Sequence, residues 1–285
     1  MVEFAYHAPA SLDGVLELLE RHGEDAHLIA GGTALVPLMR LGLVFPEHVV
    51  SLRNVEGLRE IGILPDGGLE IGALVTHREV EQSALVQRFF PPLAEAFGRV
   101  ATIRIRNQGT IGGNLVHADP ASDPPPILMA LDAQLVLASR DGTRIVPIAE
   151  FFQGLFETAV LPGEIVTAIR VPAIAPGTRG VYSKYLPGSK DDFATVSVAA
   201  VLRLDGKRCT AARIGLGSVG ATPIRARASE AKLAGALMSK EAIDAAARAA
   251  ADEIDPFDDA RGSADYKRSM MQVWLRRALE SLVSR

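Results

Sequence analysis

The chain has 285 residues, of which 48% are hydrophobic and 22% charged, and its formal net charge is −4. This length suffices for two or three domains with sizeable cores. The slightly negative net charge gives no indication of the basic surface that binds nucleic acid. Because Cys209 is the only cysteine, the sequence excludes an internal disulfide, a cysteine-ligated iron–sulfur cluster and a cysteine-rich zinc site.

Two further classes of segment are not expected. The most apolar stretch, residues 127–138, is interrupted by Asp132 and Gln134, so we expect no membrane span. The first residues lack a basic segment followed by an apolar one, so we expect no signal peptide and a cytoplasmic protein. The six histidines show no H-x-x-x-H pair, and no metal site is assigned.

The N-terminal part predicts a small parallel βαβ-like unit. Ser11 caps an amphipathic helix that ends at Gly23. An apolar strand at 27–30, a helix at 33–41 and a second strand at 49–52 then follow.

A second pattern begins at Gly68. Thr76 and Glu79 form a capping box for a helix that starts at His77. Residues 104–126 show little periodicity and predict a long loop, which in an ordered protein is usually functional. The other expected elements are a strand at 69–74, a helix at 91–100, a helix at 127–131, a hairpin of 134–137 and 144–147 turning at Asp141-Gly142, and a strand at 164–171.

Residues 172–178 have the composition of a linker, and an antiparallel pattern follows. Strands are expected at 180–186, 194–204 and 210–216, with Asp205-Gly206 as a tight turn. Two helices complete the chain, an alanine-rich one at 229–254 and one at 263–283. The apolar face expected for the second consists of Tyr266, Met270, Trp274, Ala278 and Leu282.

Two glycine-bearing segments, far apart in the chain, offer backbone amides with no side chains in the way. Such amides suit a pyrophosphate, so the two segments together predict one large phosphate-bearing ligand held between two lobes. Ordinary turns are the alternative interpretation. The first segment consists of Ala30, Gly31, Gly32, Thr33, Ala34 and Leu35, and the second of Gly109, Thr110, Ile111, Gly112, Gly113 and Asn114.

Asp123 follows the second segment and admits two roles. Its carboxylate can accept hydrogen bonds from the hydroxyls of a ribityl or ribose chain, or it can cap the helix after Pro124. The two roles carry equal weight at this point.

Residues 215–220 match G-x-G-x-x-G but do not predict a dinucleotide site. That fingerprint needs its third glycine inside a helix of a parallel βαβ unit, whereas Pro223 follows here and the strands before it pair as a hairpin. A glycine-rich strand exit is the favoured interpretation.

No Ser-His-Asp arrangement or pair of catalytic carboxylates is found, so no catalytic residue is assigned. Tyr182 and Lys184 lie two apart on one expected strand and therefore share a face. A solvated edge-strand lysine is the commoner case for such a residue, and Cys209 is interpreted as structural.

Several of these segments resemble the FAD-binding medium subunits of molybdenum hydroxylases, the xanthine dehydrogenase family. The resemblance is strongest to the branch of aerobic carbon monoxide dehydrogenase, and it covers essentially the whole chain in order. It rests on Ala30–Thr33, Ile105-Arg106-Asn107, Thr110–Asn114, Asp123, Leu161-Pro162-Gly163-Glu164, Tyr182 with Lys184, Asp192-Phe193-Ala194, Ile214-Gly215-Leu216, and Tyr266 with Arg276-Arg277-Ala278-Leu279.

The resemblance implies an α+β fold. A two-lobed FAD-binding domain at 1–175, with a small βαβ lobe at about 1–55 and a mixed α/β lobe at 56–175, is expected to precede a C-terminal domain of antiparallel sheet and helices at 178–285. FAD is expected between the lobes.

The resemblance also implies which residues hold FAD. The pyrophosphate would lie near Gly31–Leu35 and Thr110–Asn114, with Asp123 on the ribityl or a nearby sugar and Lys184 near the isoalloxazine. Ala30 and Leu161 would also belong to the site. Ala34 stands where relatives often carry Ser or Asp, so one side-chain hydrogen bond is absent. The cysteine-rich insertion of the 4-hydroxybenzoyl-CoA reductase branch is absent too.

The expected function is that of an oxidoreductase subunit. Electrons would pass from a small subunit with [2Fe–2S] clusters through FAD to an external acceptor, and substrate oxidation would occur in a large molybdopterin-binding subunit, within a dimer of heterotrimers. The alternatives are a stand-alone flavin oxidoreductase of the same FAD-binding fold and a nucleotide-binding regulatory module without turnover.

Overall fold

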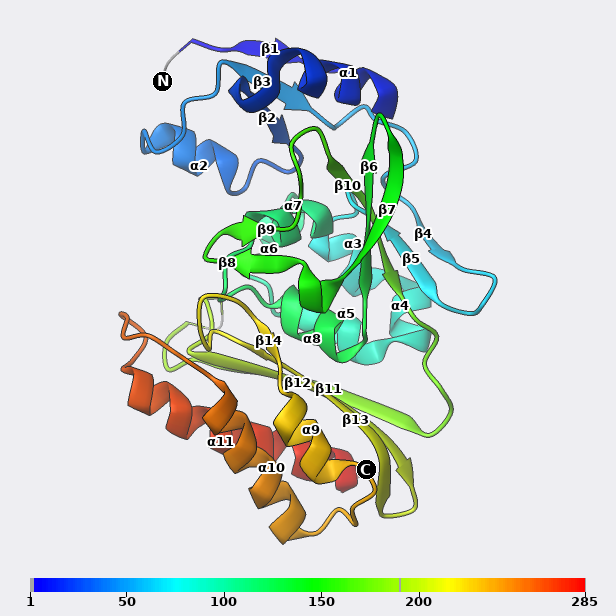
Figure 1. Cartoon of the computed structure of the whole chain (residues 1–285), viewed down its shortest axis with the longest axis vertical. Helices are drawn as coiled ribbons and strands as arrows, with labels where there is room; N and C mark the ends of the chain where they lie inside the picture. Colours follow the sequence, from blue (N-terminus) through cyan, green and yellow to red (C-terminus); the bar gives the residue numbers. More distant parts are fainter. Residues whose placement is uncertain (1–2, 190, 285) are drawn as a thin grey trace.

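The computed structural model describes residues 3–189 and 191–284. Three units are stacked along the long axis of the molecule, and each is built on its own sheet (Figure 1). This mixture of helices and several sheets confirms the expected α+β class. Within the described residues, no helix combines the length and apolar composition that a membrane crossing needs.

The N-terminal unit has a three-stranded parallel sheet in the order β1-β3-β2. The chain from β2 through α2 to β3 is the predicted βαβ-like unit. β1 was not expected, because three residues are too few to show a period. The elements are β1 (Ala5–His7), α1 (Leu12–His22), a 3₁₀ turn (Gly23–Asp25), β2 (Ala26–Ile29), α2 (Leu35–Arg40) and β3 (His48–Ser51).

The central unit has a five-stranded antiparallel sheet in the order β4-β5-β10-β6-β7. The hairpin at Asp141-Gly142 and the capping box of Thr76 and Glu79 are both present as predicted. The elements are β4 (Ile61–Ile63), β5 (Leu69–Gly72), α3 (His77–Gln82), α4 (Ala84–Phe89), α5 (Pro91–Gly98), α6 (Ile103–Arg106), α7 (Ile111–His117), α8 (Pro124–Ala130), β6 (Gln134–Ser139), β7 (Gly142–Pro147), a 3₁₀ turn (Ile148–Glu150), β8 (Phe152–Gly154), β9 (Glu157–Thr158) and β10 (Ile165–Val171).

The loop predicted at 104–126 is largely helical, so that expectation was wrong. It includes most of α6, all of α7 and the first three residues of α8. Thr110 caps α7, and Ile111 and Leu115 of this helix are fully buried. Two glycines give α7 a poor intrinsic propensity, and packing of its apolar face supplies the stability that propensity does not.

The C-terminal unit has a four-stranded antiparallel sheet and three helices. The predicted hairpin of β12 and β13 is present, and its turn consists of Gly206 and Lys207, one residue later than expected. The predicted helix at 229–254 is instead two helices, because Gly235 adopts a left-handed φ of 77° between them. The elements are β11 (Thr178–Tyr185), β12 (Val196–Asp205), β13 (Arg208–Gly217), β14 (Ile224–Arg225), α9 (Arg227–Leu233), α10 (Lys240–Glu253) and α11 (Ala264–Val283).

The buried face of α11 differs from the predicted one by about one residue. Tyr266 is 38% exposed, and Met270 and Trp274 are only partly buried. The apolar residues of this helix that are buried are Met271, Leu275, Ala278, Leu279 and Leu282.

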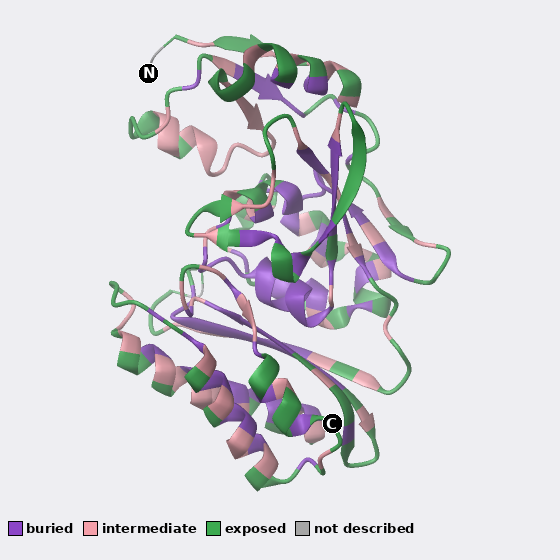
Figure 2. Ribbon diagram, viewed as in Figure 1, coloured by how far each residue is buried: buried purple, intermediate pink, exposed green. Residues whose placement is uncertain are grey.

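The C-terminal sheet is buried on both faces (Figures 1 and 2). Alternate residues of its strands point to opposite sides, so Tyr182 and Ala199 join the core of the central unit, while Val198 and Ala200 pack toward α9, α10 and α11. The central and C-terminal units therefore share a core.

Gly215 lies inside β13, which confirms that the G-x-G-x-x-G match belongs to an antiparallel strand. A Cβ on Gly215 would lie 2.0 Å from the carbonyl oxygen of Pro126 in α8. The glycine is needed for this close packing of strand and helix.

We therefore predict that Gly215→Ala lowers the free energy of unfolding by about 1–3 kcal/mol, as overpacking does. Gly62→Ala is the matched control, because Gly62 lies in strand β4 with open space around it, and we expect a change below about 1 kcal/mol there. Urea unfolding of both variants measures the difference. Equal effects would contradict the packing role.

Candidate functional site

A cavity of about 650 Å³ lies where the N-terminal and central units meet, with Lys184 of β11 and residues 191–193 at one side. This volume is in the range of cavities that hold a cofactor or a drug-sized ligand. Most of its wall is apolar, and the polar groups come from a few separate segments of the chain.

The two glycine-bearing segments touch each other at this cavity. A Cβ on Gly31 would lie 1.9 Å from the carbonyl oxygen of Gln108 and 3.2 Å from the Cα of Gly109. Gly31 is therefore required by the close approach of two backbones. Gly32 has a different requirement, a left-handed φ of 70°.

The first segment carries free backbone donors. Within the described chain, the amides of residues 31–35 donate no hydrogen bond, and all five residues line the cavity. Helical bonding begins only with the amide of Val36, which donates to the carbonyl of Gly32 at 3.1 Å. A row of unpaired N–H groups in the wall of a cavity is an arrangement that can bind phosphate oxygens.

Most amides of the second segment already donate hydrogen bonds, so the expectation of bare donors was wrong for them. Among the described residues, the amide of Thr110, which lines the cavity, is the exception in this segment and has no acceptor. Ile111 N–H donates to the carbonyl of Val75 and Gly112 N–H to that of Ala73, both at 2.9 Å. Gly113 N–H donates to Thr110 Oγ1 at 3.1 Å. These bonds fasten α7 to the end of β5, and the segment forms a wall of the cavity.

Two of the predicted site residues do not line the cavity. Ile111 is fully buried in the central core, and Leu161 is 58% exposed outside the cavity. Its neighbours Val160 and Glu164 do line it. The predicted residues that the cavity brings together are Ala30, Gly31, Gly32, Thr33, Ala34, Leu35, Thr110, Gly112, Gly113, Asn114, Asp123 and Lys184.

Asp123 forms a buried polar group with Tyr182 and Lys184. The Tyr182 hydroxyl donates to Asp123 Oδ1 at 2.5 Å, and Lys184 Nζ donates to Oδ2 at 2.9 Å. The side chains of Lys184 and Asp123 are only 3% and 4% exposed. Asp123 accepts no amide hydrogen bond from α8, so the helix-cap role was wrong, and so was the solvated-lysine interpretation of Lys184.

Burial governs the charges of this group. It raises the pKa of Asp123, while the ammonium of Lys184 and the hydrogen bond from Tyr182 act in the opposite direction. Burial also raises the pKa of Tyr182 well above its ordinary value, and the nearby Asp123 carboxylate adds to this. Tyr182 therefore remains a hydrogen-bond donor, and Lys184 supplies the positive charge nearest the carboxylate.

His77 also lines the cavity, although nothing in the sequence indicated this. It was interpreted only as the first residue of a helix. Its side chain is buried at the cavity beneath Gly109, and its Nδ1 has no partner among the described residues. Burial first, and the positive charge of Arg106 second, lower the pKa of His77 to about 4. The ring is therefore neutral at pH 7.

Comparisons with known proteins give a consistent result. Residues 2–174 match the FAD binding domain in molybdopterin dehydrogenase, and residues 182–282 match the CO dehydrogenase flavoprotein C-terminal domain. The carbon monoxide dehydrogenase medium chain of Hydrogenophaga pseudoflava is 39% identical over 283 residues, which are 99% of this chain and 98% of that one.

The likeness extends to other relatives and to solved structures. Subunit alpha of the 6-hydroxypseudooxynicotine dehydrogenase complex of Paenarthrobacter nicotinovorans is 35% identical over 99% of this chain and 95% of that one. A solved structure of the Hydrogenophaga pseudoflava carbon monoxide dehydrogenase, lacking the Mo-pyranopterin moiety, matches with a TM-score of 0.96 at 39% identity. That match covers 100% of this chain and 99% of that one.

The buried ion pair leads to a stability prediction. Asp123→Asn keeps an acceptor for Tyr182 but leaves the Lys184 ammonium buried without a counter-charge, so we expect a loss of about 3–5 kcal/mol in urea unfolding. Adding Lys184→Met should recover most of that loss. Glu17→Gln, in an exposed ion pair with Arg21, is the control and should cost less than about 1 kcal/mol. Equal losses in Asp123→Asn and Glu17→Gln would contradict the account.

His77 leads to a pH prediction. The His77 ring takes up a proton near pH 6.5 in the unfolded chain, whereas in the folded chain it takes up this proton only near pH 4. The contribution of this pKa difference to the free energy of unfolding is therefore complete above pH 6.5. It is lost as the pH falls toward 4, and the loss amounts to about 3 kcal/mol. His77→Gln should remove this part of the pH dependence of unfolding, and His117→Gln should keep it. An unchanged slope in His77→Gln would show that the ring is not held neutral.

Proposed function

The chain belongs to the family of FAD-binding medium subunits of molybdenum hydroxylases, and from that premise we propose its place in an electron-transfer route. It is a FAD-binding subunit of a molybdenum-containing oxidoreductase. We propose that electrons reach its FAD from [2Fe–2S] clusters of a small partner subunit and leave to an external acceptor. Substrate oxidation would take place in a large molybdopterin-binding subunit.

The observation that carries the site assignment is the run of free amides at residues 31–35. These amides belong to residues that line the cavity next to the contact between the two glycine segments. Two linked phosphates carry several acceptor oxygens, and a row of N–H groups can satisfy them without side chains. The residues present therefore fit a pyrophosphate, and we assign it to this segment.

The remaining site residues form the walls. Thr110, Gly112, Gly113 and Asn114 would bound the pyrophosphate from the second segment. Asp123 would use its remaining lone pairs to accept hydrogen bonds from the ribityl chain or a nearby sugar. Lys184, fixed by Asp123 and by the carbonyl of Arg99 at 3.1 Å, would place its charge near the isoalloxazine.

Bound FAD supplies the exchange of one or two electrons. The chain's own contribution is placement and electrostatics. Asp123 holds the Lys184 ammonium in a nearly water-free wall, where a fixed positive charge acts more strongly than in water. The neutral ring of His77 adds no second charge beneath the glycine segment.

We propose two domains, with the FAD-binding domain at 1–175, lobes at about 1–55 and 56–175, and the C-terminal domain at 178–285. The core that the C-terminal unit forms between its sheet and its own helices supports the division, although the other face of that sheet packs into the core of the central unit. We also propose that this subunit, the large subunit and the small subunit assemble as a dimer of heterotrimers. With Cys209 as its only cysteine and buried, the chain needs a partner to hold the clusters.

The test of this function uses the chain alone. The purified chain, loaded with FAD, should show a flavin spectrum that a chemical reductant bleaches, yet no turnover of molybdenum-hydroxylase substrates with an artificial acceptor. Turnover should begin when the large and small subunits are added. Steady turnover by the isolated chain would overturn the proposal and favour a stand-alone flavoenzyme. A chain that retains no flavin would point to a regulatory module.

A further inference from the structure

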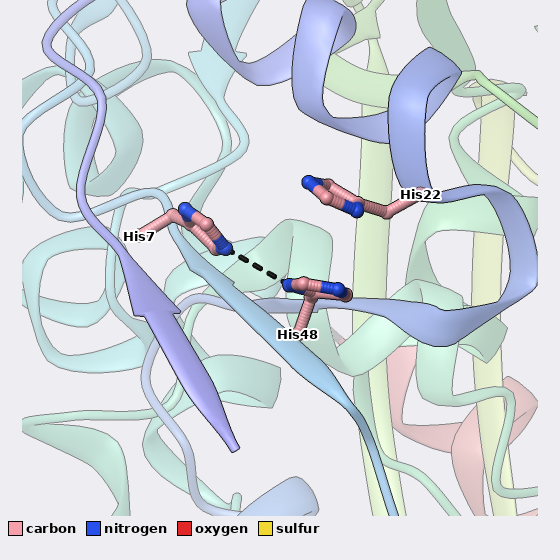
Figure 3. A group of neighbouring side chains, drawn as sticks. All are labelled: His7, His22 and His48. Carbon is pink, nitrogen blue, oxygen red and sulfur yellow. Dashed lines mark hydrogen bonds between the residues drawn. The ribbon is translucent and has the colours of Figure 1, made fainter.

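Three histidines meet at the edge of the N-terminal sheet, apart from the cavity. His7 ends β1, His22 ends α1 and His48 begins β3 (Figure 3). β1 and β3 run parallel with Ala5 opposite His48, so His7 and His48 lie on the same face of the sheet. None of the three residues lines the cavity.

Their ring nitrogens already lie close together. His7 Nε2 and His48 Nδ1 are 3.1 Å apart, and the ring of His22 stacks on that of His48 with centroids 3.7 Å apart. One nitrogen from each ring lies within 4.8 Å of the other two. In a tetrahedral zinc site with Zn–N bonds of 2.0–2.1 Å, the nitrogens are about 3.3 Å apart.

The geometry therefore requires only one adjustment. The pair from His7 and His48 has nearly the spacing of two ligands. The His22 side chain must turn to direct a nitrogen toward them, and its half-buried position at the end of α1 leaves room for this. A metal ion would then take the place of the hydrogen between the first two nitrogens.

The chemistry of the donors selects the ligand. The group consists of imidazoles alone, which suit zinc, copper, nickel and cobalt ions, whereas magnesium and calcium prefer oxygen. Metal binding needs neutral rings.

We propose that His7, His22 and His48 bind one divalent transition-metal ion of the zinc class, with a fourth position open to water. The ligands come from three elements separated by 15 and then 26 residues (7 to 22, 22 to 48), so no short sequence motif reveals them. The ion would join the ends of β1 and α1 to β3. Because β1 pairs with β3 through only three residues, the added links would stabilise this edge.

The experiment uses the full chain without an affinity tag, titrated with Co²⁺ and then with Zn²⁺. Visible Co²⁺ absorbance reports coordination, and metal analysis gives the stoichiometry. We expect one Co²⁺ per chain, displaced by Zn²⁺. His22→Gln should weaken binding at least about tenfold, on the scale of losses at metal-ligand shells, and His117→Gln, outside the group, should leave the affinity unchanged.

Two results would overturn the proposal. The first is that the chain binds no stoichiometric Co²⁺. The second is that the unaltered chain and His22→Gln bind Co²⁺ with equal affinity, which would mean that the three rings only stack. Equal FAD content in the chain and in His22→Gln shows that the fold is intact. If His22→Gln alters the fold, His7→Gln on the short edge strand provides the same comparison.

Discussion

The site depends on the contact between two backbones that are far apart in the sequence. Gly31 has no side chain because the Gln108 carbonyl occupies the position of its Cβ at 1.9 Å. That contact fixes the first glycine segment against the second, whose own amides are held by Val75 and Ala73. One segment is thus anchored, and the other presents unpaired N–H groups to the cavity. The first segment therefore supplies most of the free donors, and the second, apart from the amide of Thr110, supplies the support for it.

A second constraint links the cavity to the C-terminal unit. Asp123 precedes α8, whereas Tyr182 and Lys184 belong to β11, so their buried hydrogen bonds cross between units. The shared core beside them includes Tyr182 itself. A charged pair in such a place costs desolvation energy, and both of its residues line the cavity. The C-terminal unit therefore contributes Lys184 to the wall of the cavity.

Local signals in the sequence were sufficient for much of the fold. Thr76 with Glu79 and the turns at Asp141-Gly142 and Asp205-Gly206 identify a helix start and two hairpins, because each depends on neighbours in the chain. The helical character of 111–117 depends instead on burial of Ile111 and Leu115, and the split of the alanine-rich helix on the conformation of Gly235. Likewise, the glycine segments marked the cavity, but which of their amides stay free is decided by the carbonyls of Ala73 and Val75, which follow β5. The sequence left Asp123 with two possible roles. The choice between them depends on hydrogen bonds with Tyr182 and Lys184, which lie about 60 positions away in the chain.

The most direct test of the site is amide hydrogen exchange, followed by mass spectrometry, with and without FAD. Free amides exchange quickly, and a bound pyrophosphate would protect them. We expect the largest slowing in peptides that cover residues 31–35, and little change at Ile111 and Gly112, whose amides are already hydrogen-bonded. Protection of the second segment with none at residues 31–35 would contradict the account.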